Sequence, residues 1–317
     1  MIHFMKIVRP KNRWFKQASQ LLLVMLLTFN SYRAHATHAA GADFTYKCLG
    51  GLQYELTITF YRDCGGVAEP ATIDVNYKSA SGGYNLTATA SKIAVTGQEI
   101  TQPCISAVTS CGGGATVGIR EFIYRTTVTL PAAKTDWVFS YSVCCRNCAI
   151  TTINSPCASS SNLYVEATLN NVITPCNNSP IFSNIPIAFT CIGQNFNYNH
   201  GVLDPDGDSL VYSLITPRTA AATNVSYIAP HNTANPIITS SGFNVDPVTG
   251  DMDFTPTQTE IGILTVLVKE YRNGTLIGSV IRDLQVYTQV CPNNLPTASG
   301  IDGTNNFSIN ACPNQQI

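Results

Sequence analysis

Charged side chains are scarce in this chain of 317 residues. Asp, Glu, Lys and Arg together make up 12% of it, about half of the usual share of roughly 25%. Beyond the first 36 residues, no apolar run is long enough for a transmembrane helix, and no long window between residues 37 and 175 has a helical period. The motifs H-E-x-x-H, G-x-S-x-G and G-x-x-x-x-G-K-[ST] are also missing. These absences argue against a helical protein, a membrane span in the mature chain, and the common hydrolase and nucleotide-binding classes.

The first 36 residues have the three features of an export signal. A basic start leads into a nine-residue apolar run, residues 21–29, which is too short to span a bilayer as a helix. Ala34-His35-Ala36 then provides an A-x-A cleavage site. We therefore expect residues 1–36 to be a signal peptide and the mature protein, secreted or on the outer cell surface, to begin near Thr37.

Cleavage would leave an acidic protein. The signal holds six of the 18 lysines and arginines and no acidic residue, so 12 basic residues face 19 acidic ones, a net charge of −7. No basic stripe remains, and nucleic acid is therefore not expected as a partner.

All 12 cysteines follow the cleavage site. In an exported protein the expected state of such cysteines is disulfide-bonded. Cys145 and Cys148 have C-x-x-C spacing, but a zinc ribbon needs a second such pair and a thioredoxin-like site needs a βαβ context. Because Cys144 and Cys145 are adjacent and would point to opposite faces of a strand, we expect them to bond to different partners.

Apolar residues alternate with polar ones along most of the mature chain, as in half-buried β-strands. The first group of predicted strands is 54–60, 72–77, 84–90, 118–130, 137–143 and 163–169. The second group is 196–198, 210–215, 225–228, 242–245, 252–255, 263–271 and 276–288. Asn273-Gly274, between the last two, is a strong hairpin signal. The pattern predicts an all-β protein of tandem antiparallel β-sandwich modules with disulfides.

Two similar stretches suggest where modules meet. Cys176-Asn177-Asn178-Ser179-Pro180 is followed by a cysteine at 191, and Cys291-Pro292-Asn293-Asn294 is followed by one at 312. We expect a cysteine-rich domain at 37–175, a second sandwich at 176–290, and the start of a further, truncated module at 291–317. The repeat favours the pairs Cys176–Cys191 and Cys291–Cys312, and local loops favour Cys104–Cys111 and Cys148–Cys157, although the eight cysteines before residue 176 allow 105 connectivities.

The most distinctive loop is Asp204-Pro205-Asp206-Gly207-Asp208, which leads directly into an apolar strand. Carboxylate oxygens are the ligands that Ca²⁺ prefers, and three alternating aspartates would point to one side of an extended segment. We expect Asp204, Asp206 and Asp208 to bind calcium near a module joint, with Glu270 or Asp253 as a further ligand. The alternative is a turn whose aspartates accept hydrogen bonds from nearby backbone N–H groups. His200 lies close by in the sequence, but no partner base or nucleophile suggests catalysis.

Parts of the sequence resemble two known protein families. Residues 204–214 (DPDGDSLVYSL), 246–256 (DPVTGDMDFTP) and 262–268 (GILTVLV) resemble dystroglycan-type cadherin-like and related Ig-like repeats of bacterial surface proteins. Those repeats usually place an aspartate where this chain has Lys269-Glu270. Residues 39–51 (AAGADFTYKCLGG), with YRDC at 61–64 and KEYRNG at 269–274, resemble large secreted Bacteroidota proteins that carry gliding-motility-associated C-terminal domains. That resemblance implies type IX secretion and a role at the cell surface, often in adhesion.

The sequence therefore predicts a non-enzymatic, exported adhesion protein, the N-terminal part of a modular adhesin, in which β-sandwich modules, stiffened by calcium, present a binding face to a surface protein or glycan. Its other expected partners are neighbouring modules of the same polypeptide. Two alternatives stay open: a passive structural stalk, and a carbohydrate-binding accessory module of a larger secreted enzyme.

Overall fold

The computed structural model describes residues 39–101, 108–158, 160–186 and 189–291. These residues form β-strands and one short 3₁₀ turn, η1, at Ser110–Gly112. The strands are β1 Ala39–Gly50, β2 Gln53–Asp63, β3 Thr72–Ser79, β4 Tyr84–Lys92, β5 Gln98–Glu99, β6 Ile119–Thr129, β7 Trp137–Val143, β8 Leu163–Leu169, β9 Ile181–Phe182, β10 Phe189–Cys191, β11 Phe196–Asn199, β12 Val202–Leu203, β13 Ser209–Ile215, β14 Arg218–Ala220, β15 Thr223–Asn224, β16 Asn244–Val245, β17 Asp251–Phe254, β18 Glu260–Arg272 and β19 Thr275–Gln289. The all-β prediction is confirmed.

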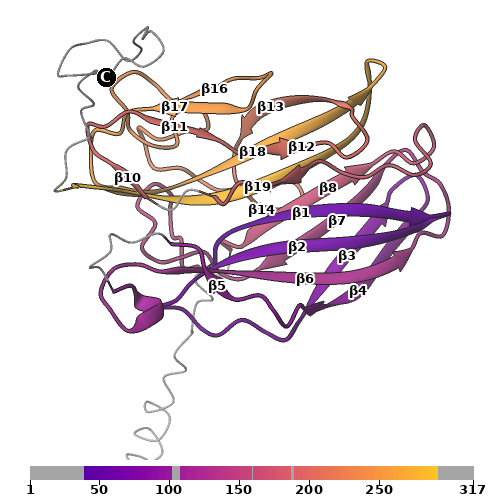
Figure 1. Cartoon of the computed structure of the whole chain (residues 1–317), viewed down its shortest axis with the longest axis horizontal. Coiled ribbons are helices and arrows are strands. Elements are labelled where there is room, and N and C mark those ends of the chain that lie inside the picture. Colours follow the sequence, from indigo (N-terminus) through magenta and orange to yellow (C-terminus); the bar gives the residue numbers. More distant parts are fainter. Residues whose placement is uncertain (1–38, 102–107, 159, 187–188, 292–317) are drawn as a thin grey trace, which may run out of the picture. The chain divides into compact units, whose positions relative to one another are not determined.

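Fourteen of these strands belong to one sheet, in the order β13-β18-β19-β1-β2-β6-β4-β3-β7-β8-β14-β15, with β5 and β10 at the side. The neighbours are antiparallel except β10, which runs parallel to β19. Figure 1 shows β18 and β19 as long adjacent ribbons and β1, β2 and β6 as a second group of neighbours. No helix in the described part of the chain has the length and apolar character to cross a membrane.

The sheet folds over a single main core, as in a β-sandwich. Phe44 of β1 stacks on Phe139 of β7 with ring centroids 6.3 Å apart, and Phe60 of β2 meets Tyr141 of β7 edge-on at 6.4 Å. Tyr46 and Tyr54 close the same aromatic cluster against Phe139. The alternation of apolar and polar residues along β2 places its apolar face in this core, as the sequence predicts.

β19 joins the two halves of the chain. One edge pairs with β18 along nearly the whole strand, while the other pairs in turn with β8, β1 and β10. Both faces of β19 are buried from Val280 to Thr288, as in a central strand. Residues 39–291 therefore fall within one compact unit, and the module boundary expected near Cys176 lies inside it.

The predicted hairpin at Asn273-Gly274 is confirmed. Both residues have left-handed backbone conformations, with φ values of 52° and 77°, and Arg272 pairs directly with Thr275 across the turn. This conformation is the one a two-residue hairpin loop requires, because its twist matches that of the flanking strands. The predicted strand at 225–228 is wrong: a short pairing, β15, ends at Asn224 instead.

Five disulfides join described cysteines, and they correct most of the predicted pairs. Cys148–Cys157 is confirmed. Cys176 pairs with Cys48, and Cys191 pairs with Cys291, so the predicted pairs Cys176–Cys191 and Cys291–Cys312 are wrong. The reason lies in the sheet: β10 lies parallel to the end of β19, which brings the Cys191 end beside the Cys291 end.

The two remaining disulfides were also not predicted. Cys111 bonds to Cys64 rather than to Cys104, which lies outside the described residues together with Cys312. A backbone hydrogen bond from Cys64 to Gly118 O holds the segment after η1 against the end of β2, which explains this pairing. Cys144 and Cys145 bond to each other, because both lie beyond the end of β7 rather than on a strand.

Candidate functional site

The acidic loop connects β12 with β13 and is held by its own first aspartate. Asp204 Oδ1 accepts hydrogen bonds from the backbone N–H groups of Asp206 and Asp208, both at 2.9 Å. Gly207 supplies the left-handed residue of the turn, with φ of 80°. These are the hydrogen bonds of the turn that the sequence offers as the alternative to a metal site. They use only one of the two carboxylate oxygens of Asp204.

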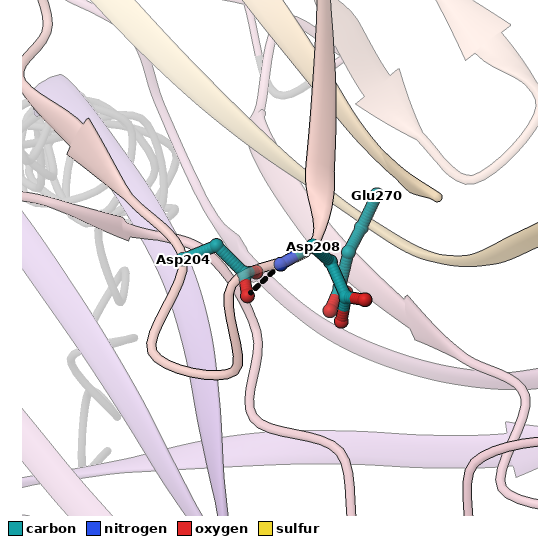
Figure 2. Close-up of side chains that lie close together, drawn as sticks. All are labelled: Asp204, Asp208 and Glu270. Atoms are coloured by element: carbon teal, nitrogen blue, oxygen red, sulfur yellow. Dashed lines mark hydrogen bonds between the residues drawn. The ribbon is translucent and has the colours of Figure 1, made fainter. Parts of the chain in front are cut away.

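Three carboxylates converge beside this turn. One oxygen from each of Asp204, Asp208 and Glu270 can be chosen so that all three lie within 4.8 Å of one another. Glu270 reaches the loop from β18, where it pairs with Leu210 of β13. Figure 2 shows the Asp208 and Glu270 carboxylates next to each other, with Asp204 on the opposite limb of the loop. Oxygens bound to one Ca²⁺ at 2.3–2.6 Å are separated by at most about 5 Å, so this spacing fits one ion.

Asp206, the third predicted aspartate, is not part of this cluster, although its Oδ2 lies 3.5 Å from the same Arg272 nitrogen that donates to Asp208. Its carboxylate accepts hydrogen bonds from the Asn178 backbone N–H at 2.8 Å and from Asn178 Nδ2 at 2.7 Å. The turn at Gly207 reverses the chain, so strand alternation does not apply. Asp253 lies on β17, in a separate three-stranded sheet, and is also outside the cluster.

Arg272 and Asn177 complete the surroundings, and neither was predicted. The Arg272 guanidinium donates to both oxygens of Asp208, at 2.8 and 2.5 Å, and to Asn177 Oδ1 at 3.0 Å. Asn177 Nδ2 in turn donates to Glu270 Oε1 at 2.7 Å. The KEYRNG stretch contains Arg272, but nothing in the pattern indicates that it turns back to the Asp208 carboxylate.

Two oxygens of the cluster have no hydrogen-bond partner among the residues that the structure describes. Glu270 Oε2 and Asp204 Oδ2 are buried and accept no hydrogen bond within the described part of the chain. Burial raises the pKa of Glu270 to about 9; the Asn177 amide opposes this shift, while the carboxylates of Asp204 and Asp208 add to it. The Arg272 guanidinium lowers the pKa of Asp208. Unpartnered buried carboxylate oxygens are costly, and a cation or a proton would satisfy them.

Without a cation, we expect stability to fall as pH rises, and Glu270→Gln to remove this dependence. The pKa of Glu270 is about 9 in the folded state, above its value of 4.5 in the unfolded chain. The folded state therefore binds more protons between these values, so the stabilisation is complete below about pH 4.5 and is lost as pH approaches about 9. Urea unfolding in EDTA at several pH values measures this for both proteins. Parallel stability curves for the parent and Glu270→Gln would contradict the expected titration.

His200 is buried apart from the cluster. Its ring lies between Phe182 and Tyr198, with centroids 6.0 and 4.9 Å away, and neither ring nitrogen has a hydrogen-bond partner within the described ranges. Burial, with a smaller contribution from the nearby Arg282 charge, lowers the pKa of His200 to about 3. The imidazole is therefore neutral, and its environment supports a packing role rather than proton transfer.

We expect His200→Phe to raise the free energy of unfolding by about 1–3 kcal/mol, because the change removes two buried ring nitrogens that have no hydrogen-bond partner among the described residues. The variant should also lose less stability on acidification. The folded-state pKa of His200 is depressed, so its contribution is complete above about pH 6.5 and is lost as pH falls toward about 3. Urea unfolding at pH 7.5 and pH 5 measures both effects; a variant less stable than the parent at both values would contradict them.

No family model matches the chain, and no curated protein or solved structure shows a significant match to it.

Proposed function

We propose that this chain is an exported protein of the cell surface or extracellular space that binds a surface partner through its β-sheet unit. The disulfides carry this proposal. Cys48–Cys176 and Cys191–Cys291 close separations of 128 and 100 residues, and cross-links of this kind form and persist in oxidising compartments outside the cytosol. The export signal and the cleavage site after Ala36 agree with that location, with type IX secretion as the proposed route.

The proposed activity is adhesion without catalysis, in which a cross-linked sheet presents a binding face to a protein or glycan. A continuous core and long-range disulfides favour this role, because a pre-organised surface loses little conformational entropy on binding. A passive stalk would have the same cross-links but no ligand. A carbohydrate-binding accessory module would recognise sugars and act beside a separate catalytic domain.

Binding by the isolated protein separates these functions. The mature chain from Thr37, coupled to beads, should attach saturably to cells of the producing organism or to extracellular-matrix proteins. Beads carrying the reduced and alkylated protein should not attach. Failure of the native beads to attach to any surface would contradict adhesion and leave the stalk. Attachment confined to saccharides on a glycan array would replace it with the accessory-module function.

We further propose that Asp204, Asp208 and Glu270 bind calcium and that the ion stiffens this end of the unit. The three oxygens are close enough to share one ion, and two buried carboxylate oxygens lack partners within the described residues. Backbone carbonyls and water would complete the six to eight ligands that Ca²⁺ takes. The ion would connect the β12–β13 loop to β18, since the ligands come from both.

Calcium titration by calorimetry should give a dissociation constant of about 10⁻⁴–10⁻³ M, which is typical of extracellular modules. At 10 mM, calcium with a dissociation constant near 1 mM would stabilise the fold by about 1.4 kcal/mol. Asp208→Asn and Glu270→Gln should abolish the heat. Asp246→Asn, in an exposed turn outside the cluster, is the matched control and should keep it. No heat and no change in Tm for the parent would contradict the calcium site.

A further inference from the structure

A groove crosses the outer face of the β1-β2-β6 sheet, away from the acidic loop. It consists of two adjoining cavities of about 310 and 420 Å³, which share Glu121, Ile123 and Ile185 in their linings. We call this feature the Glu121 groove. None of its residues belongs to the proposed calcium cluster.

The register of β1, β2 and β6 determines which residues form the floor of the Glu121 groove. Asp43, Thr59 and Ile123 form one cross-strand row over β1, β2 and β6, and Tyr61 and Glu121 lie side by side in the next row. The carboxyl groups of Asp43 and Glu121 therefore lie on the same sheet face, two strand spacings or about 10 Å apart across the strands.

Two segments form the walls, and hydrogen bonds fix both. The backbone N–H of Gly97 donates to Glu121 O at 2.7 Å, which holds the loop before β5 against β6. On the other side, Arg282 donates to Asn184 O at 2.9 Å, and Tyr198 OH donates to Ile185 O at 2.8 Å. Hydrogen bonds to backbone carbonyls therefore hold both walls of the groove.

The lining is acidic. It contains the carboxylates of Asp43, Glu99 and Glu121 and one cation, Arg282, which leaves two uncompensated negative charges. Arg282 is 2% exposed, and its guanidinium already donates to Asp43 Oδ2, the Tyr61 hydroxyl and the Asn184 carbonyl. It is therefore not available to a ligand as a free cation.

Two carboxyl groups remain open to a ligand. Asp43 is 3% exposed, and both of its described hydrogen bonds go to Oδ2, so Oδ1 is left without a partner among the described residues. The Glu121 side chain makes no hydrogen bond or ion pair within the described residues. Burial raises the pKa of Glu121, the Asp43 carboxylate adds to this shift, and Arg282 opposes it. A positive group beside Glu121 would supply the missing compensation.

Apolar side chains flank these acids. Ile123 lies on the floor, Ile185 is 50% exposed at the shared boundary, and Val95 is 81% exposed at the outer wall. A ligand that combines an aliphatic stem with a positive end matches this combination.

We propose that the Glu121 groove binds a lysine or arginine side chain of an extended segment of a partner protein. The cationic end lies against Glu121, and the methylene stem lies along Ile123 and Ile185. This deepens the proposed function and rests on it, because it assigns the adhesive face and the class of partner.

The probe is the peptide acetyl-Ala-Ala-Lys-Ala-Ala-amide, titrated into the mature chain at low and high salt. Single-residue recognition should be weak, with a dissociation constant of about 1 mM, and should weaken further as salt screens the charge. The arginine peptide should bind as well as the lysine peptide or better, because its guanidinium can contact a carboxylate through two nitrogens. The norleucine peptide, which keeps the stem and lacks the charge, should not bind.

Glu121→Gln should weaken lysine-peptide binding at least about tenfold, the effect of losing one charged partner. The variant should keep the Tm of the parent, because the half-buried charge that it removes has no hydrogen bond or ion pair with the described residues. Glu55→Gln, on the outer face of β2 but beyond the groove lining, is the matched control and should bind normally. Thr59→Arg gives a second variant, in which an arginine on the floor should block binding. Equal binding by the parent and both groove variants would overturn the proposal.

The proposed function and the groove can fail separately. Bead attachment that survives Glu121→Gln would show adhesion through another face. Peptide binding by a protein whose beads attach to no surface would keep the groove and contradict adhesion.

Discussion

Asp283→Ala is expected to lower the free energy of unfolding by about 3–5 kcal/mol, the usual cost of leaving one partner of a buried ion pair alone. Asp283 and Arg146 are 0% and 1% exposed. Both Asp283 oxygens accept hydrogen bonds from the Arg146 guanidinium, at 2.6 and 2.8 Å. Removal of the carboxylate would leave the guanidinium charge buried and unpaired.

Other contacts of this pair increase the expected effect. Thr265 on β18 donates to Asp283 Oδ2 at 2.8 Å, and Arg146 donates to the backbone carbonyl of Arg218 at 3.1 Å. The pair therefore connects the loop after β7 to β19, β18 and β14. We expect the loss to reach strands from both halves of the chain, because β19 lies between them.

The matched control replaces both partners with apolar residues of similar volume. Arg146→Met with Asp283→Leu should recover most of the stability, because a buried ion pair often contributes little compared with good apolar packing. Guanidinium unfolding of the parent, the single variant and the double variant measures these free energies. A single variant within 1 kcal/mol of the parent would contradict the buried-pair assignment.

Removing Cys48–Cys176, the disulfide with the longest separation among the described cysteines, is expected to have an effect of similar size. Cys48→Ser with Cys176→Ser should cost about 4–5 kcal/mol, since the chain-entropy contribution grows with the length of the closed loop. The separation here is 128 residues. The change should also loosen the candidate calcium site, because Asn177 and Asn178, next to Cys176, contact Glu270 and Asp206.

Cys148→Ser with Cys157→Ser is the matched control, because its bond spans only 9 residues. It should cost about 2–3 kcal/mol on the same entropy argument. Unfolding midpoints of the three proteins give the comparison. Equal losses in the two variants would contradict the loop-length account, and no loss in the first would contradict the Cys48–Cys176 bond.

Local pattern predicted much of the fold. The bounds of β7 and β8 match the predicted strands, and the β18–β19 hairpin forms at Asn273-Gly274, because alternation and turn chemistry are properties of neighbouring residues. The acidic loop and Glu270 were also predicted, and the structure places Asp204, Asp208 and Glu270 together.

The contacts between segments far apart in the sequence could not be predicted from local pattern. The strand β1, which carries Asp43 and Cys48 and lies between β19 and β2, was missed. Its alternation includes Ala42, Phe44 and Tyr46, but buried polar residues and glycine interrupt the signal. Arg282 and Asp283 suggest an exposed segment by composition, yet both are buried because each meets an opposite charge from a distant part of the chain.

The candidate calcium site likewise combines features that are local in the sequence with features that depend on long-range packing. The spacing of Asp204 and Asp208 is local, and their backbone hydrogen bonds follow from it. The roles of Asn177 and Arg272 depend on how β18 and the segment after β8 approach the loop. Amino-acid composition does not indicate which distant segments contact the acidic loop.

Mass spectrometry of the native protein recovered outside the cell, without reduction, tests the central claim most directly. The account predicts an N-terminus at Thr37 and linked peptides that contain Cys48–Cys176 and Cys191–Cys291. Protein found only inside the cell, with residues 1–36 retained and these four cysteines as free thiols, would contradict it.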